Sequence, residues 1–346
     1  MKKLLIVSSD SIHVYNYIRL IEADFDEILL LSNAQNANFK HPTVVLDFSI
    51  RNPIRAWRTA KRIREILLSF QPDVFHVHQA NSFAFLSFWC TGGLKIPRIL
   101  TAWGSDVLLL PKQNFLMKLM VTYSLRVADG LTADANFVAD EIHHLLQNKN
   151  KEVLIANFGI QLEIKSEPKQ NIIYSNRLHK KLYRVDHIIK AFHKFVNQPG
   201  NESWLLVIAA TGEESESLLK LVDQLGISNQ VEFVGWIDKE TNASYYAKAK
   251  IFISIPESDA TSISLLEAMA SGCFPVLSDL PANKQWVKHL ENGYIVKDLS
   301  ADFFSDVLKL NMDKALEYNK GLVELHGTMQ ANRNKFMNLY NTLLRK

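Results

Sequence analysis

The stretch that decides the fold runs from Glu257 to Pro275 and reads E-S-D-A-T-S-I-S-L-L-E-A-M-A-S-G-C-F-P. The apolar segment Ile251–Ile255 before it is typical of a buried β-strand, and the strong helix formers inside it predict a helix directly afterwards. Thr261 or Ser262 is expected to cap this helix. A helix that begins at a strand end directs free backbone N–H groups at the sheet edge, so the stretch predicts an anion site in an α/β protein.

Two carboxylates flank the predicted anion site. Asp259 precedes the helix, and Glu267 lies about two turns further along. A carboxylate beside a polar ligand can accept hydrogen bonds from two hydroxyl groups, which suits a ribose or a sugar. The alternative from periodicity alone is that Asp259 favours the helix start through the dipole and that Glu267 is a solvated helix residue.

The same residues resemble a known signature. The motif E-x7-E followed by A-M-A-x-G-x-P-V is typical of retaining, nucleotide-sugar-dependent glycosyltransferases of the GT-B fold, in the large group 1 family. This chain reads Asp259-x7-Glu267 and then Ala268-Met269-Ala270-Ser271-Gly272-Cys273-Phe274-Pro275-Val276. The first carboxylate is Asp instead of Glu, which shortens its reach by one methylene. The resemblance favours the functional interpretation of both carboxylates.

Length and composition restrict the class of protein. The 346 residues suit two domains, and nearly half of them are hydrophobic. A net charge of +3 gives no reason to expect nucleic-acid binding. The two cysteines, Cys90 and Cys273, form no metal-binding or disulfide pattern, and no apolar run reaches the length of a membrane span. We expect a cytoplasmic protein, with peripheral contact to the inner face of the plasma membrane as the alternative.

Strands and helices alternate along the whole chain, which predicts an α/β protein with two doubly wound parallel sheets. The resemblance implies the GT-B fold, in which two Rossmann-like domains face a cleft. We expect an acceptor-binding domain at 1–165 and a nucleotide-sugar-binding domain at 166–330, with a terminal helix at 331–346 that crosses back to the first domain. The polar segment Gln161–Asn171 is the expected linker.

Polar residues end two predicted strands of the first half. In Asp73–His78 the alternation places His76 and His78 on one face. His78, nearer the carboxyl end, is the one expected to face a ligand, and no third residue completes a metal site. After the strand 98–102 comes Trp103-Gly104-Ser105-Asp106-Val107, which is similar to the family motif H-G-S-D-V with Trp103 in place of the histidine. The resemblance implies acceptor-side positions for Gly104, Ser105 and Asp106, although G-S-D is also ordinary turn chemistry.

The segment Pro111–Ala128 is expected to be helical, with apolar residues among Lys112, Lys118 and Arg126. One interpretation is a helix that packs on the core. The other is a basic amphipathic surface that touches an anionic membrane carrying a lipid-linked acceptor.

A basic loop opens the second half. After the strand 172–175 the chain reads Asn176-Arg177-Leu178-His179-Lys180-Lys181-Leu182-Tyr183-Arg184, similar to the family pattern G-R-L-x-x-x-K-G. Arg177 matches the arginine that binds the donor diphosphate. Leu182 stands at the usual lysine position, so either Lys181 or Arg184 is expected to supply the second cation.

Two further positions are candidates for the donor site. Gly212 follows the strand 205–209, where the family has a glycine-containing turn near the base and phosphate. Trp236 follows a segment that resembles the family's F-x-G motif, and it is expected either to stack on the nucleotide base or to close the core.

The resemblance implies a retaining hexosyltransferase that uses a nucleotide sugar as substrate and needs no cofactor. Because a cation and a helix start can stabilise the diphosphate, we expect it to be independent of metal. Glu267 binds the ribose, Asp259 orients the sugar, and Arg177 with the N–H groups of Thr261, Ser262 and Ile263 stabilises the departing diphosphate. The acceptor is expected to be a glycan or a lipid-linked glycan in the synthesis of a cell-surface polysaccharide, such as a capsule or lipopolysaccharide. The alternatives are a nucleotide-sugar epimerase or hydrolase of the same fold, and a non-catalytic partner subunit.

Overall fold

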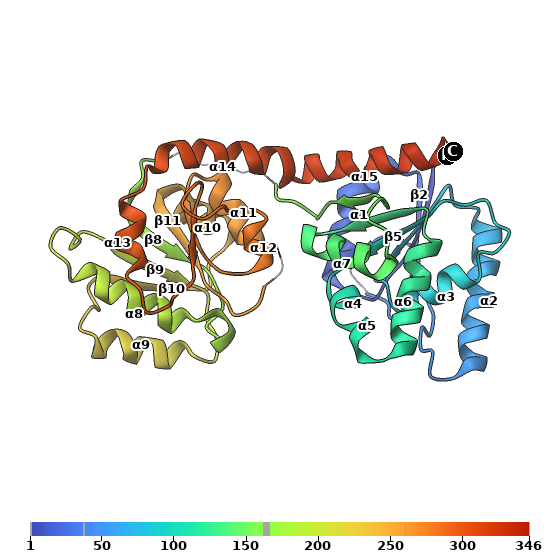
Figure 1. The fold of residues 1–346 in the computed structure, drawn as a ribbon, viewed down its shortest axis with the longest axis horizontal. Helices are drawn as coiled ribbons and strands as arrows, with labels where there is room; N and C mark the ends of the chain where they lie inside the picture. The colour runs from blue at the N-terminus through green and yellow to red at the C-terminus, as the bar shows by residue number, and fades with distance from the viewer. Residues whose placement is uncertain (1, 37–38, 162–166, 260, 346) are drawn as a thin grey trace. The chain divides into compact units, whose positions relative to one another are not determined.

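The computed structural model describes the chain except for residues 1, 37–38, 162–166, 260 and 346. The chain forms two compact units: unit 1 comprises Met1–Phe158 and Met329–Lys346, and unit 2 comprises Gly159–Thr328 (Figure 1). The expected domain boundary between 165 and 166 lies outside the described residues, as do five of the eleven residues of the expected linker. Strand β8 already begins at Gln170, within the segment expected to be linker.

Unit 1 is built on a parallel sheet with the strand order β3-β2-β1-β4-β5-β6-β7. Most of the residues of β1 and β4 are apolar and fully buried, as expected of a sheet covered on both faces. The strands are β1 (Lys3–Val7), β2 (Glu27–Ser32), β3 (Thr43–Val45), β4 (Val74–His78), β5 (Arg98–Ala102), β6 (Gly130–Ala133) and β7 (Val153–Ile155).

The helices of unit 1 divide between the two faces of the sheet. Connections from β3 through β7 all move in one direction across the sheet, so right-handed crossovers place α2, α3, α6 and α7 on one face and α1 on the other. The helices are α1 (Ile12–Ile21), α2 (Pro53–Phe70), α3 (Ser82–Trp89), α4 (Ser105–Leu108), α5 (Leu110–Gln113), α6 (Phe115–Val127), α7 (Asn136–Leu146) and α15 (Met329–Leu344), with a short 3-10 helix η1 (Glu22–Asp24).

The terminal helix α15 is part of the core of unit 1. Phe336, Tyr340 and Leu343 are buried and share one apolar cluster with residues of β1 and α1. Arg333 adds a two-point ion pair with Asp24, in which Nε lies 2.8 Å from Oδ2 and Nη2 lies 2.6 Å from Oδ1. A segment distant in sequence therefore completes this unit.

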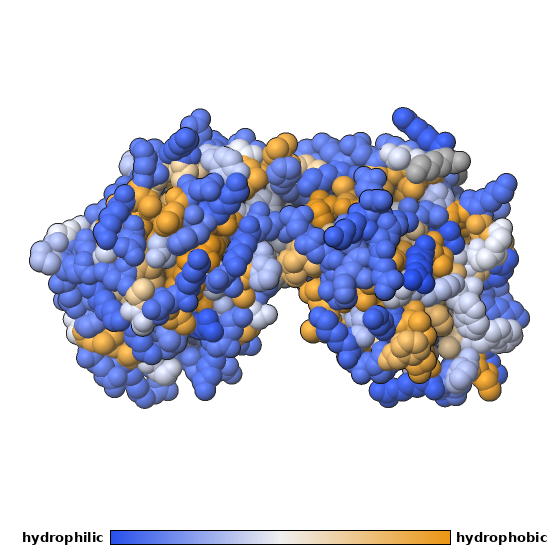
Figure 2. All heavy atoms as spheres, viewed as in Figure 1, coloured by the Kyte–Doolittle hydropathy of each residue, from blue (hydrophilic) through white to orange (hydrophobic). Residues whose placement is uncertain are grey.

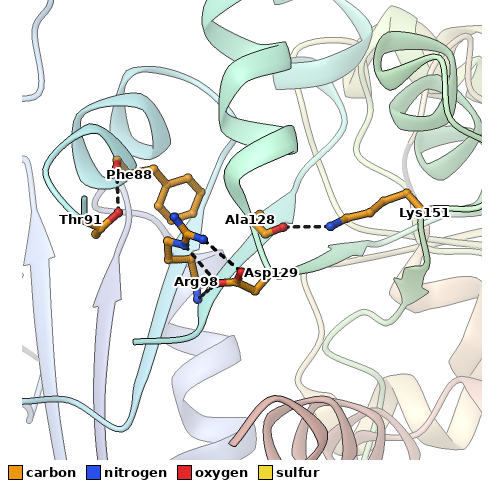
Figure 3. Close-up of polar contacts among 6 residues, drawn as sticks. All are labelled: Phe88, Thr91, Arg98, Ala128, Asp129 and Lys151. Carbon is orange, nitrogen blue, oxygen red and sulfur yellow. Dashed lines mark hydrogen bonds and ion pairs between the residues drawn. The ribbon is translucent and has the colours of Figure 1, made fainter. Parts of the chain in front are cut away.

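The segment 111–128 is not one continuous helix. It contains the end of α5 and all of α6, and the break falls at Asn114, whose extended backbone and side-chain oxygen cap α6 by accepting a hydrogen bond from the Met117 N–H. At the other end of α6, the Ala128 carbonyl accepts a hydrogen bond of 3.0 Å from Lys151 Nζ (Figure 3). Beside it, Arg98 holds Asp129 through Nε and Nη2 at 3.0 and 3.1 Å. These contacts fix the position of α6 on the sheet.

Unit 2 contains a second parallel sheet, with the order β10-β9-β8-β11-β12-β13. Its strands are β8 (Gln170–Ser175), β9 (Leu205–Ala209), β10 (Val231–Gly235), β11 (Ala249–Ser254), β12 (Phe274–Ser278) and β13 (Tyr294–Val296). The helices are α8 (Val185–Val196), α9 (Ser215–Gln224), α10 (Lys239–Lys248), α11 (Ile263–Ala270), α12 (Pro281–Lys284), α13 (Phe303–Leu308) and α14 (Met312–His326), with η2 (Lys181–Tyr183) as a 3-10 turn. Two doubly wound parallel sheets confirm the predicted fold class.

Candidate functional site

Arg177 is the centre of the candidate donor site. It follows β8, and its guanidinium reaches the loop before α11, where Nη2 lies 2.5 Å from Asp259 Oδ2 and Nη1 donates to Ser262 Oγ at 2.9 Å. Ser262 occupies the N-cap position of α11, but its side chain does not cap the helix. One of the two hydroxyl groups expected to cap the helix therefore accepts a hydrogen bond from Arg177 instead. Three predicted site residues from two neighbouring strand ends therefore meet at the start of α11.

The loop that carries Arg177 is held in several ways. The guanidinium carbon lies 4.5 Å from the ring centroid of Tyr183, in a cation–π arrangement. The next turn is anchored by Glu257, whose N–H donates to the Leu182 carbonyl at 2.8 Å and whose Oε1 lies 3.3 Å from Arg184 Nε. These contacts hold the loop and the Arg177 side chain in a defined position.

The two candidates for the second cation differ in their surroundings. Arg184 forms the ion pair with Glu257, and its backbone lies in the left-handed region at φ 52°. Lys181 is exposed on η2 and has no ion-pair partner among the residues that the structure describes. Lys181 is therefore the cation that a phosphate could recruit without breaking an existing pair.

Glu267 lies on α11, next to a group of tyrosines. Burial, followed by the nearby Glu267 charge, raises the pKa of Tyr246 well above its ordinary value. The Asn176 amide Nδ2 donates to Tyr246 Oη at 2.8 Å and to Asn242 Oδ1 at 3.1 Å, and the Tyr174 hydroxyl donates to the same Asn242 oxygen at 2.6 Å. Sequence reasoning assigned no role to Asn176, although it stands where the family pattern has glycine. This network supports the strand end that carries Arg177.

Gly212 allows two loops of this site to pack closely. A Cβ atom at this position would lie 2.4 Å from the carbonyl oxygen of His179, so only glycine fits the observed backbone. The His179 imidazole is buried, and its Nδ1 lies 2.8 Å from Ser215 Oγ at the start of α9. Sequence reasoning did not single out His179, and only its fixed position after Arg177 could have drawn attention to it.

Trp236 follows β10 and is 71% exposed. Of the two roles open from the sequence, closing the core is therefore wrong. The indole is free to stack on a ligand.

Of the residues expected on the acceptor side, His78 ends β4 and is fully buried. Its Nδ1 accepts a hydrogen bond of 3.2 Å from the indole Nε1 of Trp103. Burial lowers the pKa of His78 to about 3, so the ring is neutral and carries its proton on Nε2. This Nε2 is buried and has no hydrogen-bond partner among the described residues. His76, on the same face, contacts Tyr17, Tyr340 and Thr101 and belongs to the core.

The G-S-D segment forms the turn after β5. Gly104 has a φ of 99°, a conformation that favours glycine, and Ser105 begins the short helix α4. Asp106 is buried, and its carboxylate accepts hydrogen bonds from the N–H groups of Ala80 at 2.6 Å and Trp103 at 3.0 Å. Asp106 therefore ties the ends of two strands together.

Two features near this turn were not predicted. Asp134 directly follows β6, and burial together with the nearby Asp106 charge raises its pKa to about 6. The rings of His13 and Phe158 lie 4.5 and 5.7 Å from the ring of Trp103. They come from separate segments, which the sequence pattern alone could not bring together.

No group of three or more His, Cys, Asp or Glu side chains that could hold a metal ion occurs among the described residues. Within the same part of the chain, no helix combines the length and apolar character needed to cross a bilayer.

Two family models match the chain. The model described as glycosyl transferases group 1 matches residues 160–323, and the glycosyl transferase 4-like model matches residues 2–135. Together they cover most of both units. The chain belongs to the group 1 glycosyltransferases. The residues Arg177, Asp259, Ser262 and Glu267 all lie within the match to the group 1 family model.

Curated relatives of the chain include two synthases whose names contain a glycosyl group. The N-acetyl-alpha-D-glucosaminyl L-malate synthase of Bacillus anthracis is 23% identical over 298 residues, which cover 81% of this chain and 76% of the relative. The alpha-monoglucosyldiacylglycerol synthase of Streptococcus pneumoniae is 27% identical over 256 residues, covering 67% of this chain and 57% of the relative.

Solved structures establish the fold of this group 1 glycosyltransferase as GT-B. The Anabaena protein Alr3699/HepE in complex with UDP superposes with a TM-score of 0.77 at 11% identity, covering 99% of this chain and 100% of the other. The lipopolysaccharide outer core galactosyltransferase WaaB superposes with a TM-score of 0.75 at 14% identity and 99% coverage of both chains.

Proposed function

We propose that this glycosyltransferase transfers a hexose from a nucleotide sugar to a glycan or lipid-linked acceptor, with retention of the anomeric configuration and without a divalent metal. The product would serve the synthesis of a cell-surface polysaccharide such as lipopolysaccharide or capsule. The acceptor would be met at the inner face of the plasma membrane.

The observation that carries the proposal is the convergence of Arg177, Asp259 and Ser262 at the amino end of α11. A guanidinium beside the free N–H groups of a helix start is suited to a diphosphate, because both favour negative charge. Glu267 lies on the same helix, within electrostatic reach of Tyr246. The names of solved neighbours, which record complexes with UDP and UDP-glucose, support a nucleotide-sugar donor.

In the proposed reaction the bond between the anomeric carbon and the diphosphate oxygen breaks, and a new bond forms to an acceptor hydroxyl on the same face of the sugar. The departing phosphate takes the proton of that hydroxyl. Arg177 and the N–H groups of Thr261, Ser262 and Ile263 stabilise the charge that develops on the diphosphate. Lys181 adds a second cation, Asp259 orients the sugar, and Glu267 accepts the hydroxyl groups of the ribose.

The test is ligand-induced thermal stabilisation of the purified protein by UDP-, GDP- and ADP-sugars without added metal. Stabilisation by one nucleotide series, lost in Glu267→Ala, would support the donor site, because a ligand that binds only the folded state raises its melting temperature. Lys288→Ala, at an exposed lysine on unit 2, is the control and should respond as the parent does. The absence of stabilisation by every nucleotide sugar would contradict the proposal and favour the non-catalytic alternative.

A further inference from the structure

The outer side of α6 exposes a row of large apolar residues. Its inner side packs on unit 1 through Met120, Val121 and Leu125, which are buried. On the outer side Phe115, Leu116 and Leu119 are 71%, 70% and 50% exposed. Figure 2 shows hydrophobic atoms, in orange, at the surface in the lower part of the region where Figure 1 draws α6, with hydrophilic atoms around them. Single exposed apolar residues are ordinary, but three within five positions of one helix form a patch.

The apolar surface continues onto the neighbouring helix α3. The ring of Tyr123 on α6 lies 5.7 Å from that of Phe85 on α3, and Phe85 stacks on Trp89 at 6.1 Å. Trp89 is itself exposed. We call the six residues Phe85, Trp89, Phe115, Leu116, Leu119 and Tyr123 the α3–α6 patch.

Cations border the patch, and acidic residues are almost absent around it. Residues 107–128 contain Lys112, Lys118 and Arg126, all exposed, and no Asp or Glu. Helix α2 packs against α3 on the same face of the sheet (Figure 1). Helix α2 and the residues just before it expose five further cations, and Glu65 is the only acidic residue of the helix. The cations are Arg51, Arg55, Arg58, Lys61 and Arg62.

The distribution of these side chains matches an anionic bilayer better than a protein or nucleic acid. Tyr and Trp favour the interface between lipid tails and headgroups, aliphatic and Phe side chains favour the tails, and Lys and Arg favour anionic headgroups. Helix α2 repeats this arrangement, because Ile54 and Trp57 are exposed among its cations and Lys61 lies 5.6 Å from the Trp57 ring.

The surface is preformed. Lys151 holds the carboxyl end of α6 at Ala128, and Thr91 Oγ1 donates to the Phe88 carbonyl at 2.7 Å at the end of α3 (Figure 3). The helices that carry the patch therefore need no ordering to meet a flat partner.

We propose that the α3–α6 patch, together with the cations of α2, binds the surface of an anionic lipid bilayer. The inference rests on the proposed function only for the role of membrane binding, which would bring unit 1 to a lipid-linked acceptor. The binding itself is independent of catalysis.

The experiment is co-flotation of the purified full chain with vesicles of phosphatidylcholine, with and without phosphatidylglycerol, at low and high salt. We expect binding to the phosphatidylglycerol vesicles, little binding to pure phosphatidylcholine, and weakening by salt. The triple substitution Phe115→Ser, Leu116→Ser and Leu119→Ser should reduce binding at least about tenfold, since three apolar side chains leave the membrane. Arg58→Glu with Lys61→Glu should weaken binding to the anionic vesicles.

Exposed leucines elsewhere give a matched control. Leu219→Ser with Leu325→Ser removes two similarly exposed leucines from unit 2 and should bind vesicles as the parent does. Equal binding by the triple variant and the parent would overturn the proposal. A parent dimer that the triple substitution converts to a monomer, without any vesicle binding, would also overturn it in favour of self-association.

The outcome separates this inference from the proposed function. Vesicle binding should persist in Arg177→Ala, and nucleotide-sugar stabilisation should persist in the triple variant. If the parent binds anionic vesicles but no nucleotide sugar raises its melting temperature, the result would contradict the proposed function and leave membrane binding intact.

Discussion

Arg177 and Asp259 form an ion pair of 2.5 Å, so the predicted ligand of the phosphate and the predicted ligand of the sugar neutralise each other in the absence of substrate. Their side chains are 11% and 22% exposed, which makes the pair stronger than an ordinary surface contact. A diphosphate that binds Arg177 must therefore share the guanidinium with Asp259. In the proposed donor site, this pair would couple the diphosphate end of the donor to its sugar end.

Substitutions of this pair should have opposite effects on binding of the nucleoside diphosphate. Arg177→Ala should weaken UDP or GDP binding about tenfold or more, because a charge-assisted bond is lost. Asp259→Asn should leave this affinity unchanged or higher, because the competing carboxylate is gone, yet lower kcat about 100-fold, because the sugar is no longer oriented. Isothermal titration and steady-state kinetics measure the two effects, with Lys288→Ala as control. Equal losses of diphosphate affinity in both variants would contradict the coupling.

The hydrogen bond from Trp103 to His78 should contribute to the stability of unit 1. Trp103→Phe keeps an aromatic ring but removes the indole N–H, which leaves the buried Nδ1 of His78 without a donor. We expect a loss of about 1–3 kcal/mol in the free energy of unfolding, measured by urea denaturation. The matched control is Trp236→Phe at an exposed indole, with an effect below about 0.5 kcal/mol. Similar values for the two variants would show that the bond contributes nothing.

The buried histidines predict a loss of stability in acid. Burial lowers the pKa of His78 to about 3. Burial, followed by the repulsion between the two rings when both are protonated, lowers the pKa of His76 well below its ordinary value. Both titrate near 6.5 in the unfolded chain, so below that pH the unfolded state binds protons that the native state does not. The free energy of unfolding should fall as pH drops below 6.5, by up to about 1.4 kcal/mol per pH unit for each histidine.

Asp134 opposes this trend over part of the range. Its raised pKa of about 6 means that the native state binds the extra proton between about pH 4 and pH 6, so its contribution falls as pH rises. Because Asp134 is present in both proteins, a comparison of His78→Gln with the parent cancels its contribution. The variant should show a shallower fall in melting temperature between about pH 7 and pH 5, whereas the exposed His144→Gln should not. Parallel curves for all three proteins would contradict the assignment.

Two glycines should respond to alanine in opposite directions. Gly212→Ala places a Cβ 2.4 Å from the His179 carbonyl oxygen, so the loop next to Arg177 must move. We expect destabilisation of about 1–3 kcal/mol and weaker binding of the nucleotide sugar. Gly321→Ala, in the interior of α14 with no atom near the new methyl, should stabilise by about 0.5–1 kcal/mol. Differential scanning calorimetry of the two variants measures both changes in stability. An unchanged stability in Gly212→Ala would show that the loop can move at no cost in free energy.

Much of the architecture could be predicted because its signals are local. The buried strand Ile251–Ile255, the helix formers after it and the periodic apolar runs each report on a few neighbouring residues. The positions of Arg177 and Glu267 in the fold followed from the same local pattern, since parallel strands end at one edge of a sheet.

What the sequence could not provide depends on contacts between distant segments. The use of Ser262 by Arg177, the close approach of Gly212 to His179, and the meeting of Trp103 with His13 and Phe158 all require three-dimensional packing. The break at Asn114 was also missed, because capping chemistry competes there with a continuous apolar period.

The completion of unit 1 by α15 has a consequence for how the protein is made. While a ribosome translates residues 159–328, all strands of the unit 1 sheet have already been synthesised. The core residues Phe336, Tyr340 and Leu343 have not. During that interval His76 has no Tyr340 hydroxyl to contact, and the apolar surface beneath α15 faces water or a chaperone. Unit 2 is contiguous and can finish first, so the half of the enzyme that begins synthesis is the last to reach its native state.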